Sequence, residues 1–390
     1  MKEYKHTAIS KVINKSMISM IVMVILIGMG EHMSERFLPL YIVALGGTAY
    51  AAGILNFLDN FLSAVYSPIG GVVSDRVGYK RALMIFTVVA LIGYLIVILI
   101  PAWQAVLVGA MFFISWTAIS LPAVMSMVSK VVSKNKRTMG VSIHSLVRRI
   151  PMAIGPVFGG ALLTYYDNIQ GMRIAFIIAF VLGVASLFFI NRYMEDEAKN
   201  EVKEEERKAH FSPALKSLLL SDILVRFAEQ IPYAYLAIWI VNHKGLTSFH
   251  VGLFTVIEMI TALLVYIPVA YFADKYGKKP FVLITFGFFT LFPLVFFLSN
   301  SVWTFIFAFI IRGLKEFGEP TRKALIMDLA PENAKARTFG LYYFIRDIIV
   351  SAAALGGALL WGISPFVNFM TAFVFGVIGI IVFAMFGRNK

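Results

Sequence analysis

Long runs of apolar residues dominate the sequence, and each is about as long as a helix that crosses the hydrocarbon core of a bilayer. The runs lack the period-2 alternation of a lipid-facing barrel strand and are far longer than its segments. The pattern therefore predicts an all-α membrane protein with about twelve transmembrane helices. They are expected near residues 17–44, 48–73, 82–101, 103–129, 138–164, 171–192, 216–243, 249–273, 281–299, 302–328, 337–361 and 364–386.

Composition supports a membrane protein. The chain is 59% hydrophobic and 15% charged, against roughly 45–50% and about 25% for a soluble domain. A short basic segment precedes the first run, but the run is longer than a signal peptide's and no small-residue cleavage site follows, so we expect a retained helix. The chain has no cysteine, which excludes disulfide and thiolate chemistry.

The positive charges mark one side of the membrane. Of the 35 Lys and Arg, 24 lie in the two terminal segments and in alternate loops, whereas the remaining loops hold only Arg173 and Lys244. The positive-inside rule then places both termini in the cytoplasm of a multi-pass protein of the cell (inner) membrane. The net charge of +13 thus reflects topology, and we expect a lipid bilayer rather than nucleic acid as the partner.

One long hydrophilic stretch interrupts the apolar pattern. Residues 195–213 mix both charge signs with few apolar residues and close on a proline, which is typical of a solvated linker. We therefore expect an N-terminal six-helix bundle over 1–193, a cytoplasmic linker over 194–215 and a C-terminal six-helix bundle over 216–390.

The two expected bundles repeat one another. The segment that begins at Gly53 aligns without a gap to the segment that begins at Gly252, an offset of 199 residues. Matching positions include Asp75 with Asp274 and Gly78 with Gly277. Pseudo-symmetric halves of this kind are the architecture of alternating-access transporters, and the duplication argues against a single-pass receptor or a membrane enzyme.

The loop between the second and third runs, "GGVVSDRVGYKR", resembles the signature of the major facilitator superfamily. A glycine lets the chain reverse tightly, and an Asp near a helix end can meet a base or a helix N-terminus. The resemblance implies a conformational latch; the alternative is a topological anchor. The latch residues are Gly71, Asp75, Arg76, Gly78, Lys80 and Arg81, with Asp274 and Gly277 in the degenerate second copy.

Two shorter elements resemble subfamilies. In the fifth run, Gly155, Pro156, Gly159 and Gly160 match the Gly-Pro-x-x-Gly-Gly element of drug:proton antiporters. Small residues there also allow close helix packing, which is the alternative interpretation. In the first run, Glu35–Phe37 is similar to the ExxERF element of proton-coupled peptide transporters.

Charged residues at the expected membrane depth need partners, because a charge facing lipid costs about 2.5–3.5 kcal/mol. In the superfamily, helices 1, 4, 7 and 10 line a central cavity, and three of these four carry charges here. We expect either a substrate and coupling site or a structural ion-pair network. The candidates are Glu31, Glu35, Arg36, Asp59, Arg149, Arg226, Glu229, Glu258, Arg312, Glu316, Glu319, Arg346 and Asp347, with Arg148, Asp222, Lys315, Arg322 and Lys323 at similar depth.

Glu31 and Glu35 are the candidates for proton coupling. They lie one helical turn apart, where two carboxylates repel and low polarity disfavours both charges. We expect the pair to bind a proton and to titrate as a coupled unit, with Arg36 and Asp59 nearby. Alternatively, Arg36 and partners such as Arg148, Arg149 or Arg226 hold both carboxylates charged in a static network.

These features predict a secondary transporter that moves a small organic solute by alternating access, powered by protons. No GxxxxGK[ST] loop is present, which argues against direct use of ATP. We expect neither enzymatic activity, a cofactor nor a metal site, and a monomer. The favoured function is proton-coupled efflux of amphipathic or drug-like compounds; the alternative is proton-coupled uptake of a charged or zwitterionic metabolite or peptide. Tyr41, Trp116, Tyr233, Tyr235 and Trp239 are candidates to line the cavity.

Overall fold

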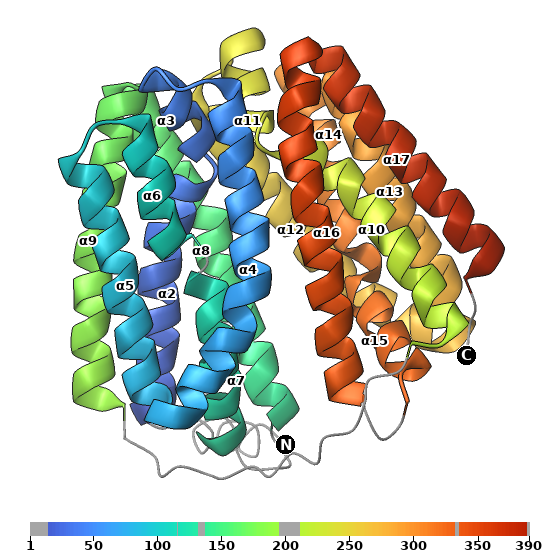
Figure 1. Ribbon diagram of the computed structural model, residues 1–390, viewed down its shortest axis with the longest axis horizontal. Coiled ribbons are helices and arrows are strands. Elements are labelled where there is room, and N and C mark those ends of the chain that lie inside the picture. The colour runs from blue at the N-terminus through green and yellow to red at the C-terminus, as the bar shows by residue number, and fades with distance from the viewer. Residues whose placement is uncertain (1–14, 115, 132–136, 195–210, 332–334, 388–390) are drawn as a thin grey trace, which may run out of the picture. The chain divides into compact units, whose positions relative to one another are not determined.

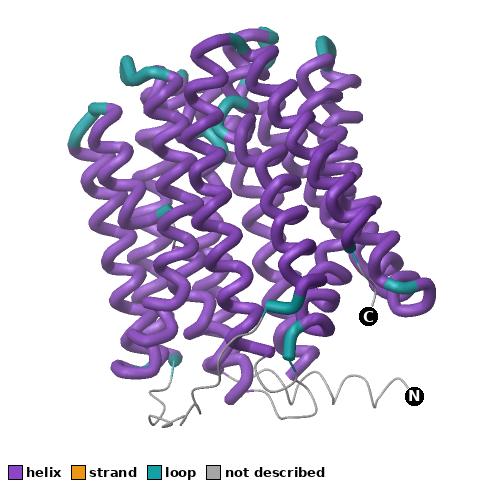
Figure 2. The backbone as a smooth tube through the Cα atoms, turned by 45° about the vertical axis from the view of Figure 1, so that its right-hand side comes forward, coloured by secondary structure: helices purple, strands orange, loops and turns teal. Residues whose placement is uncertain are grey.

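The computed structural model describes residues 15–114, 116–131, 137–194, 211–331 and 335–387. Within these ranges the chain is helical apart from short connections, and no strand is present (Figure 2). The chain divides into two compact units: unit 1 comprises residues 1–45 and 62–202, and unit 2 comprises 46–61 and 203–390.

Unit 1 is built around α2, which packs against both α8 and α9 (Figure 1). The α5 helix packs against α6, α7 and α9, and thus completes the bundle. The helices are α2 (Lys15–Glu35), α3 (Leu38–Ala44), α4 (Ala49–Val77, from residue 62 onward), α5 (Tyr79–Leu99), α6 (Trp103–Phe113), α7 (Trp116–Val131), α8 (Arg137–Tyr166) and α9 (Asn168–Tyr193).

Unit 2 is built around α10, which packs against α13, α16 and α17, while α12 packs against α14. The helices are α10 (Pro213–Tyr233), α11 (Leu236–Ile238), the π-helix η2 (Trp239–His243), α12 (Ser248–Tyr276), α13 (Lys278–Leu298), α14 (Val302–Leu314), the 3₁₀-helix η3 (Lys315–Gly318), α15 (Glu319–Leu329), α16 (Lys335–Ile363) and α17 (Pro365–Phe386).

The first turns of α4 belong to unit 2 because they bond to α10 and its continuation. The Tyr235 hydroxyl donates to the Ala49 carbonyl at 3.1 Å, and Asn56 Nδ2 donates to the Gln230 carbonyl at 3.0 Å. Gly53 allows this approach, since a Cβ there would lie 2.4 Å from the Ala358 Cβ.

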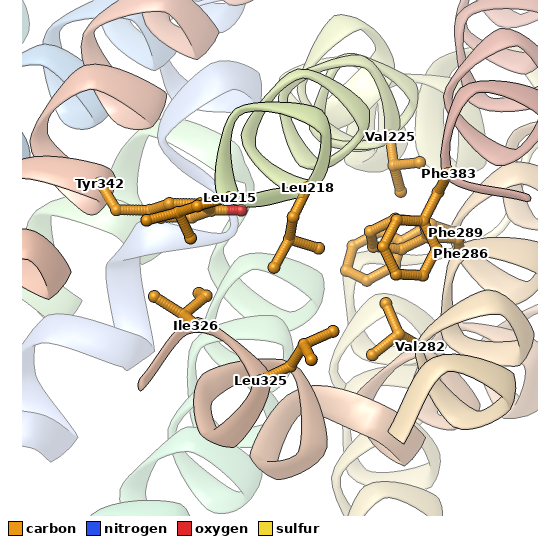
Figure 3. Close-up of a cluster of buried hydrophobic side chains, with 10 residues drawn as sticks. All are labelled: Leu215, Leu218, Val225, Val282, Phe286, Phe289, Leu325, Ile326, Tyr342 and Phe383. Atoms are coloured by element: carbon orange, nitrogen blue, oxygen red, sulfur yellow. The ribbon is translucent and has the colours of Figure 1, made fainter. Parts of the chain in front are cut away.

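The core of unit 2 is a compact apolar cluster (Figure 3). Val225 of α10, Phe286 and Phe289 of α13 and Phe383 of α17 gather on one side, and the rings of Phe286 and Phe383 meet edge to face at 5.4 Å. The burial and close packing of these apolar side chains hold α10, α13 and α17 together.

Twelve helical passes are present, as predicted, and three of them are interrupted within the described residues. The breaks fall between α2 and α3, around α11 and η2, and at η3, which are the first, seventh and tenth passes. Gly318 and Pro320 mark the last of these breaks. The fourth pass consists of α6 and α7. In the described residues, eight helical spans are long and apolar enough to cross a membrane, judged by length and composition alone. The passes of α4, α8, α10 and α14–α15 complete the twelve.

The two signature loops reverse the chain in the same way. Gly78 between α4 and α5 has φ 88°, and Gly277 between α12 and α13 has φ 89°. A side chain at such angles is strained, so the matched glycines have a direct conformational reason. The duplication is therefore visible in backbone geometry as well as in sequence.

Candidate functional site

Glu31 is a buried acid on α2, with 6% of its surface exposed. The Thr117 hydroxyl of α7 donates to Glu31 Oε2 at 2.7 Å. Glu31 takes part in none of the ion pairs formed within the described residues. Its carboxyl group is thus held by one neutral hydrogen bond in a place where an isolated charge is costly.

Glu35 has a different partner, although it lies one turn after Glu31. Its Oε2 atom is 2.7 Å from His32 Nδ1 on the same helix, and 24% of its side chain is exposed. The two acids therefore lie in unlike environments: Glu31 is buried against Thr117, whereas Glu35 is more exposed and contacts an ionisable base.

The Gly-Pro-x-x-Gly-Gly element of α8 packs directly on this part of α2. A Cβ at Gly159 would lie 1.9 Å from the Met33 carbonyl oxygen, and one at Gly155 would lie 3.0 Å from the His32 backbone. Pro151, one turn earlier, fits against Gly28. Small residues in α8 therefore set the position of the helical turn that carries Glu31.

A small cavity opens beside this turn, between α2, α7 and α8. The space available to the centre of a water molecule is about 20 Å³, enough for one or two waters or one polar group. Thr117, which holds Glu31, is part of its wall, as are Trp116, Ser120 and Arg148. The hydrogen-bonded acid thus lies behind the side of the cavity wall that Thr117 forms.

Unit 2 holds its charges in a different way, beginning with Asp222 of α10, which is fully buried. Arg322 of α15 pairs with its Oδ1 atom, and the Tyr342 hydroxyl donates to Oδ2 at 3.1 Å. Arg346 of α16 lies 3.5 Å from Oδ2 and pairs with Asp347 at 2.7 Å. Two arginines and a hydroxyl thus compensate one buried carboxylate.

Glu319 continues this network from Arg322 toward the middle of the unit. Its Oε2 atom is 2.5 Å from Arg322 Nη2 and 3.7 Å from Arg226 Nη2, while Lys323 lies 3.3 Å from Oε1. Three bases share this carboxylate.

The network ends at two further acids. Glu229 accepts from Arg226 at 2.6 Å and from Lys315 at 2.5 Å. Glu258 of α12 pairs with Arg312 at 3.1 Å and lies 3.7 Å from Lys315. Each acid of this chain of contacts faces at least one base, so the charges largely cancel within unit 2.

The predicted site residues therefore separate into two groups. The structure brings Arg226, Glu229, Glu258, Arg312, Glu319, Arg346 and Asp347 into one network together with Asp222, Lys315, Arg322 and Lys323, and it leaves Glu31 outside any ion pair of the described residues. Arg36, Asp59, Arg149 and Glu316 each contact other groups. Thr117 was missed, because a threonine in an apolar run gives no sequence signal of its acidic partner.

The aromatic candidates have mixed roles. Trp116 lines the unit 1 cavity. Tyr41 is buried and its ring centroid lies 6.0 Å from that of Phe176. Tyr235 stacks on Trp361 at 4.4 Å, and Trp239 contacts the same ring edge to face.

Of the charged residues in the two latch loops, the structure describes the side chains of the bases. In the second copy, Lys278 pairs with Asp328 at the end of α15, and Lys279 donates to the Ala384 carbonyl at 3.0 Å. Arg76 and Arg81 of the first copy are exposed. The side chains of Asp75 and Asp274 lie outside the described residues.

Comparison with known proteins decides the family. The family model of the Major Facilitator Superfamily matches residues 16–228 and 218–390. The chain belongs to the major facilitator superfamily. As a member of it, the protein is a multi-pass membrane transporter of small molecules and not an enzyme.

Several members of the superfamily resemble this chain. An uncharacterized MFS-type transporter of Bacillus subtilis (strain 168) is 27% identical over 45% of this chain and 44% of its own. A multi-drug resistance efflux pump PmrA homolog of Lactococcus lactis (strain IL1403) is 24% identical over 91% of this chain and 90% of its own. A POT family transporter crystallised with a thioalcohol-conjugated peptide shares the fold, with a TM-score of 0.76, 16% identity and coverage of 95% and 94%.

Proposed function

We propose that this transporter exports amphipathic organic compounds in exchange for protons, and that Glu31 is the group that carries the proton. The observation that carries the proposal is the contact between Glu31 and Thr117, in which a buried carboxyl group is bonded to a neutral hydroxyl and not to a base. A carboxyl group that is buried without a cation in contact favours its protonated form. Such a group can load and release a proton when access to water changes.

The charges of unit 2 support a different role. Asp222, Glu229 and Glu319 each contact at least two bases, and ion pairing of this kind favours the charged carboxylate. Permanently charged acids hold their bases in place but do not exchange protons. We therefore assign the network to positioning of α10, α14–α15 and α16.

Export as the direction is supported by the relative from Lactococcus lactis, whose name describes a multi-drug efflux pump. The packing of Gly155 and Gly159 on α2 also supports it, because the element that resembles drug:proton antiporters contacts the turn that bears Glu31. For this export we take both termini to lie on the cytoplasmic side, as the loop charges predict.

The test uses purified protein in inside-out proteoliposomes with an acidic interior and radiolabelled chloramphenicol, a neutral amphipathic amide. The wild-type protein should accumulate the compound, whereas Glu31→Gln should lose accumulation but retain exchange between compartments of equal pH. Glu35→Gln, changed one turn away, is the matched control and should still accumulate it. Undiminished accumulation by Glu31→Gln would contradict the proposal.

A second candidate is uptake of a charged or zwitterionic metabolite together with protons. The doubly signed network of unit 2 favours it, since paired charges can also bind a substrate that carries both signs. Under this alternative, an external acidic pH should drive a zwitterionic dipeptide into right-side-out vesicles, and chloramphenicol should not move against its gradient.

A further inference from the structure

We infer that the cavity of unit 1 is a subsite for an acceptor oxygen of a neutral amphipathic solute, with Trp116 and Arg148 as the donors. The inference deepens the proposed export function, because it places one polar group of the solute next to the proton site. It stands on the cavity itself and on two donor side chains for which the described residues provide no acceptor.

The first donor is the indole N–H of Trp116. The residue is buried, with 5% of its surface exposed, and its Nε1 atom has no hydrogen-bond partner. Buried donors are almost always paired, so an orphaned N–H in a cavity wall indicates a group that arrives from outside the chain. The cavity that Trp116 lines is large enough for one such group.

The second donor is the guanidinium of Arg148 on α8. Arg148 lines the same cavity, and its guanidinium enters none of the hydrogen bonds or ion pairs between described residues. The hydroxyls of the wall are already committed as donors: Thr117 donates to Glu31 at 2.7 Å, and Ser120 donates to the Thr117 carbonyl at 3.4 Å.

His32 also lines the cavity, and its Nδ1 atom contacts Glu35 at 2.7 Å. Among the described wall residues, Trp116 and Arg148 are the donors for which no acceptor is present, and together they suit a carbonyl-type oxygen.

The rest of the wall defines the remainder of the solute. Val24 of α2 and Leu121 and Val124 of α7 are apolar lining residues. The cavity has room for one polar group, so the apolar body of the solute must lie outside it, next to the apolar part of its wall. A compound with one strong acceptor oxygen next to an apolar body fits this arrangement, which is the chemistry of ketones, amides and esters with aryl or alkyl groups.

The charge state of Glu31 controls the preference for a neutral solute. Charged and titratable groups within electrostatic reach of Glu31 are His32 and Glu35 on α2, Arg148 on α8 and Tyr94 on α5. When Glu31 is ionised, it balances the charge of Arg148. When Glu31 is protonated, the charge of Arg148 is no longer offset. The probes are therefore compared at alkaline pH, where Glu31 is ionised.

The experiment compares two probes of nearly equal shape: valerophenone, a phenyl ketone, and pentylbenzene, in which a methylene replaces the carbonyl. Binding to the full chain in lipid nanodiscs is measured by saturation-transfer NMR at one alkaline pH without a gradient. Trp116→Phe, which removes the N–H and keeps the ring, should weaken ketone binding by about fivefold and leave pentylbenzene unchanged. Arg148→Met should have the same selective effect.

Trp239→Phe is the matched control, because Trp239 in unit 2 also has a buried Nε1 atom without a partner. It should leave both probes unchanged. Equal weakening of both probes by Trp116→Phe would show a packing role only, and unchanged ketone binding would show that the N–H meets no ligand. Either result, or absence of saturable ketone binding by the wild-type protein, overturns the inference.

The outcome is separable from that of the proposed function. If Glu31→Gln still accumulates solute while Trp116→Phe selectively weakens ketone binding, the subsite stands and the coupling role fails. If Glu31→Gln is uncoupled while Trp116→Phe binds the ketone normally, the coupling role stands and the subsite fails.

Discussion

The hydroxyl of Thr117 on α7 donates to the carboxyl group of Glu31 on α2 over 2.7 Å. This contact joins α7 to the helix that carries the acidic turn, and among the described residues it is the one hydrogen bond to the Glu31 side chain. In Thr117→Val, the side chain keeps its shape but loses the donor. An ionised Glu31 would then have no hydrogen bond from α7 and would cost more.

We therefore predict that Thr117→Val favours protonation of Glu31. Half-maximal accumulation of chloramphenicol should then require a less acidic interior. The required proton concentration should fall by about tenfold or less, and a tenfold change corresponds to about 1.4 kcal/mol. Thr117→Ser keeps the hydroxyl and should behave like the wild-type protein. An identical pH dependence in all three proteins would show that the bond has no influence on coupling.

A second prediction concerns the close contact between α8 and α2. Gly159→Ala places a Cβ 1.9 Å from the Met33 carbonyl oxygen, so the helices must move apart. We expect a loss of about 1–3 kcal/mol in unfolding free energy, seen as a lower melting temperature in detergent. Gly356→Ala is the control from the matching GGALL segment of unit 2, since no atom lies within 4 Å of its added Cβ; an equal loss there would contradict the packing account.

The third prediction concerns the buried network of unit 2. Asp222→Asn leaves Arg322 and Arg346 without their shared carboxylate, and we expect about 3–5 kcal/mol of destabilisation. Tyr342→Phe removes one hydrogen bond to the same carboxylate and should cost less, about 1.5–3 kcal/mol. Thermal unfolding of the purified variants measures both. If Asp222→Asn were as stable as Tyr342→Phe, the network would not be holding α10, α15 and α16 together.

The fourth prediction tests orientation. The chain has no cysteine, so single cysteines report accessibility without background. Tyr165→Cys, in an exposed position in the last turn of α8, should react with an impermeant maleimide in intact cells. Lys275→Cys, which is also exposed, should react only after the membrane is opened. The reverse pattern would invert the topology that the loop charges predict.

The sequence was sufficient for features that depend on local chemistry or on repetition. Hydrophobic length located the passes, and the duplicated signature located Gly78 and Gly277, whose shared positive φ follows from the turn that both loops must make. The position of Gly159 was also predicted, because small residues at helical spacing indicate close packing.

Features that depend on which helices become neighbours were not predictable. Charge spacing placed Glu31 and Glu35 on one face of the helix, but their partners differ. Glu31 accepts a hydrogen bond from Thr117 of α7, whereas Glu35 contacts His32 of its own helix, α2. Arg226, one of the bases considered for Glu31, instead pairs with Glu229 and Glu319 in unit 2. The break between α2 and α3 was missed, although Pro39 in the first turn of α3 is a sequence signal for a helix start.

The most direct test of the central claim, that Glu31 carries the proton, needs no substrate. Infrared difference spectroscopy of the purified protein detects the carbonyl stretch of a protonated carboxyl group and follows it as the pH is raised. We predict such a band near neutral pH in the wild-type protein, its loss in Glu31→Gln, and its retention in Glu229→Gln, where the changed acid contacts Arg226 and Lys315. A band that persists in Glu31→Gln, or that is absent from the wild-type protein, would contradict the claim.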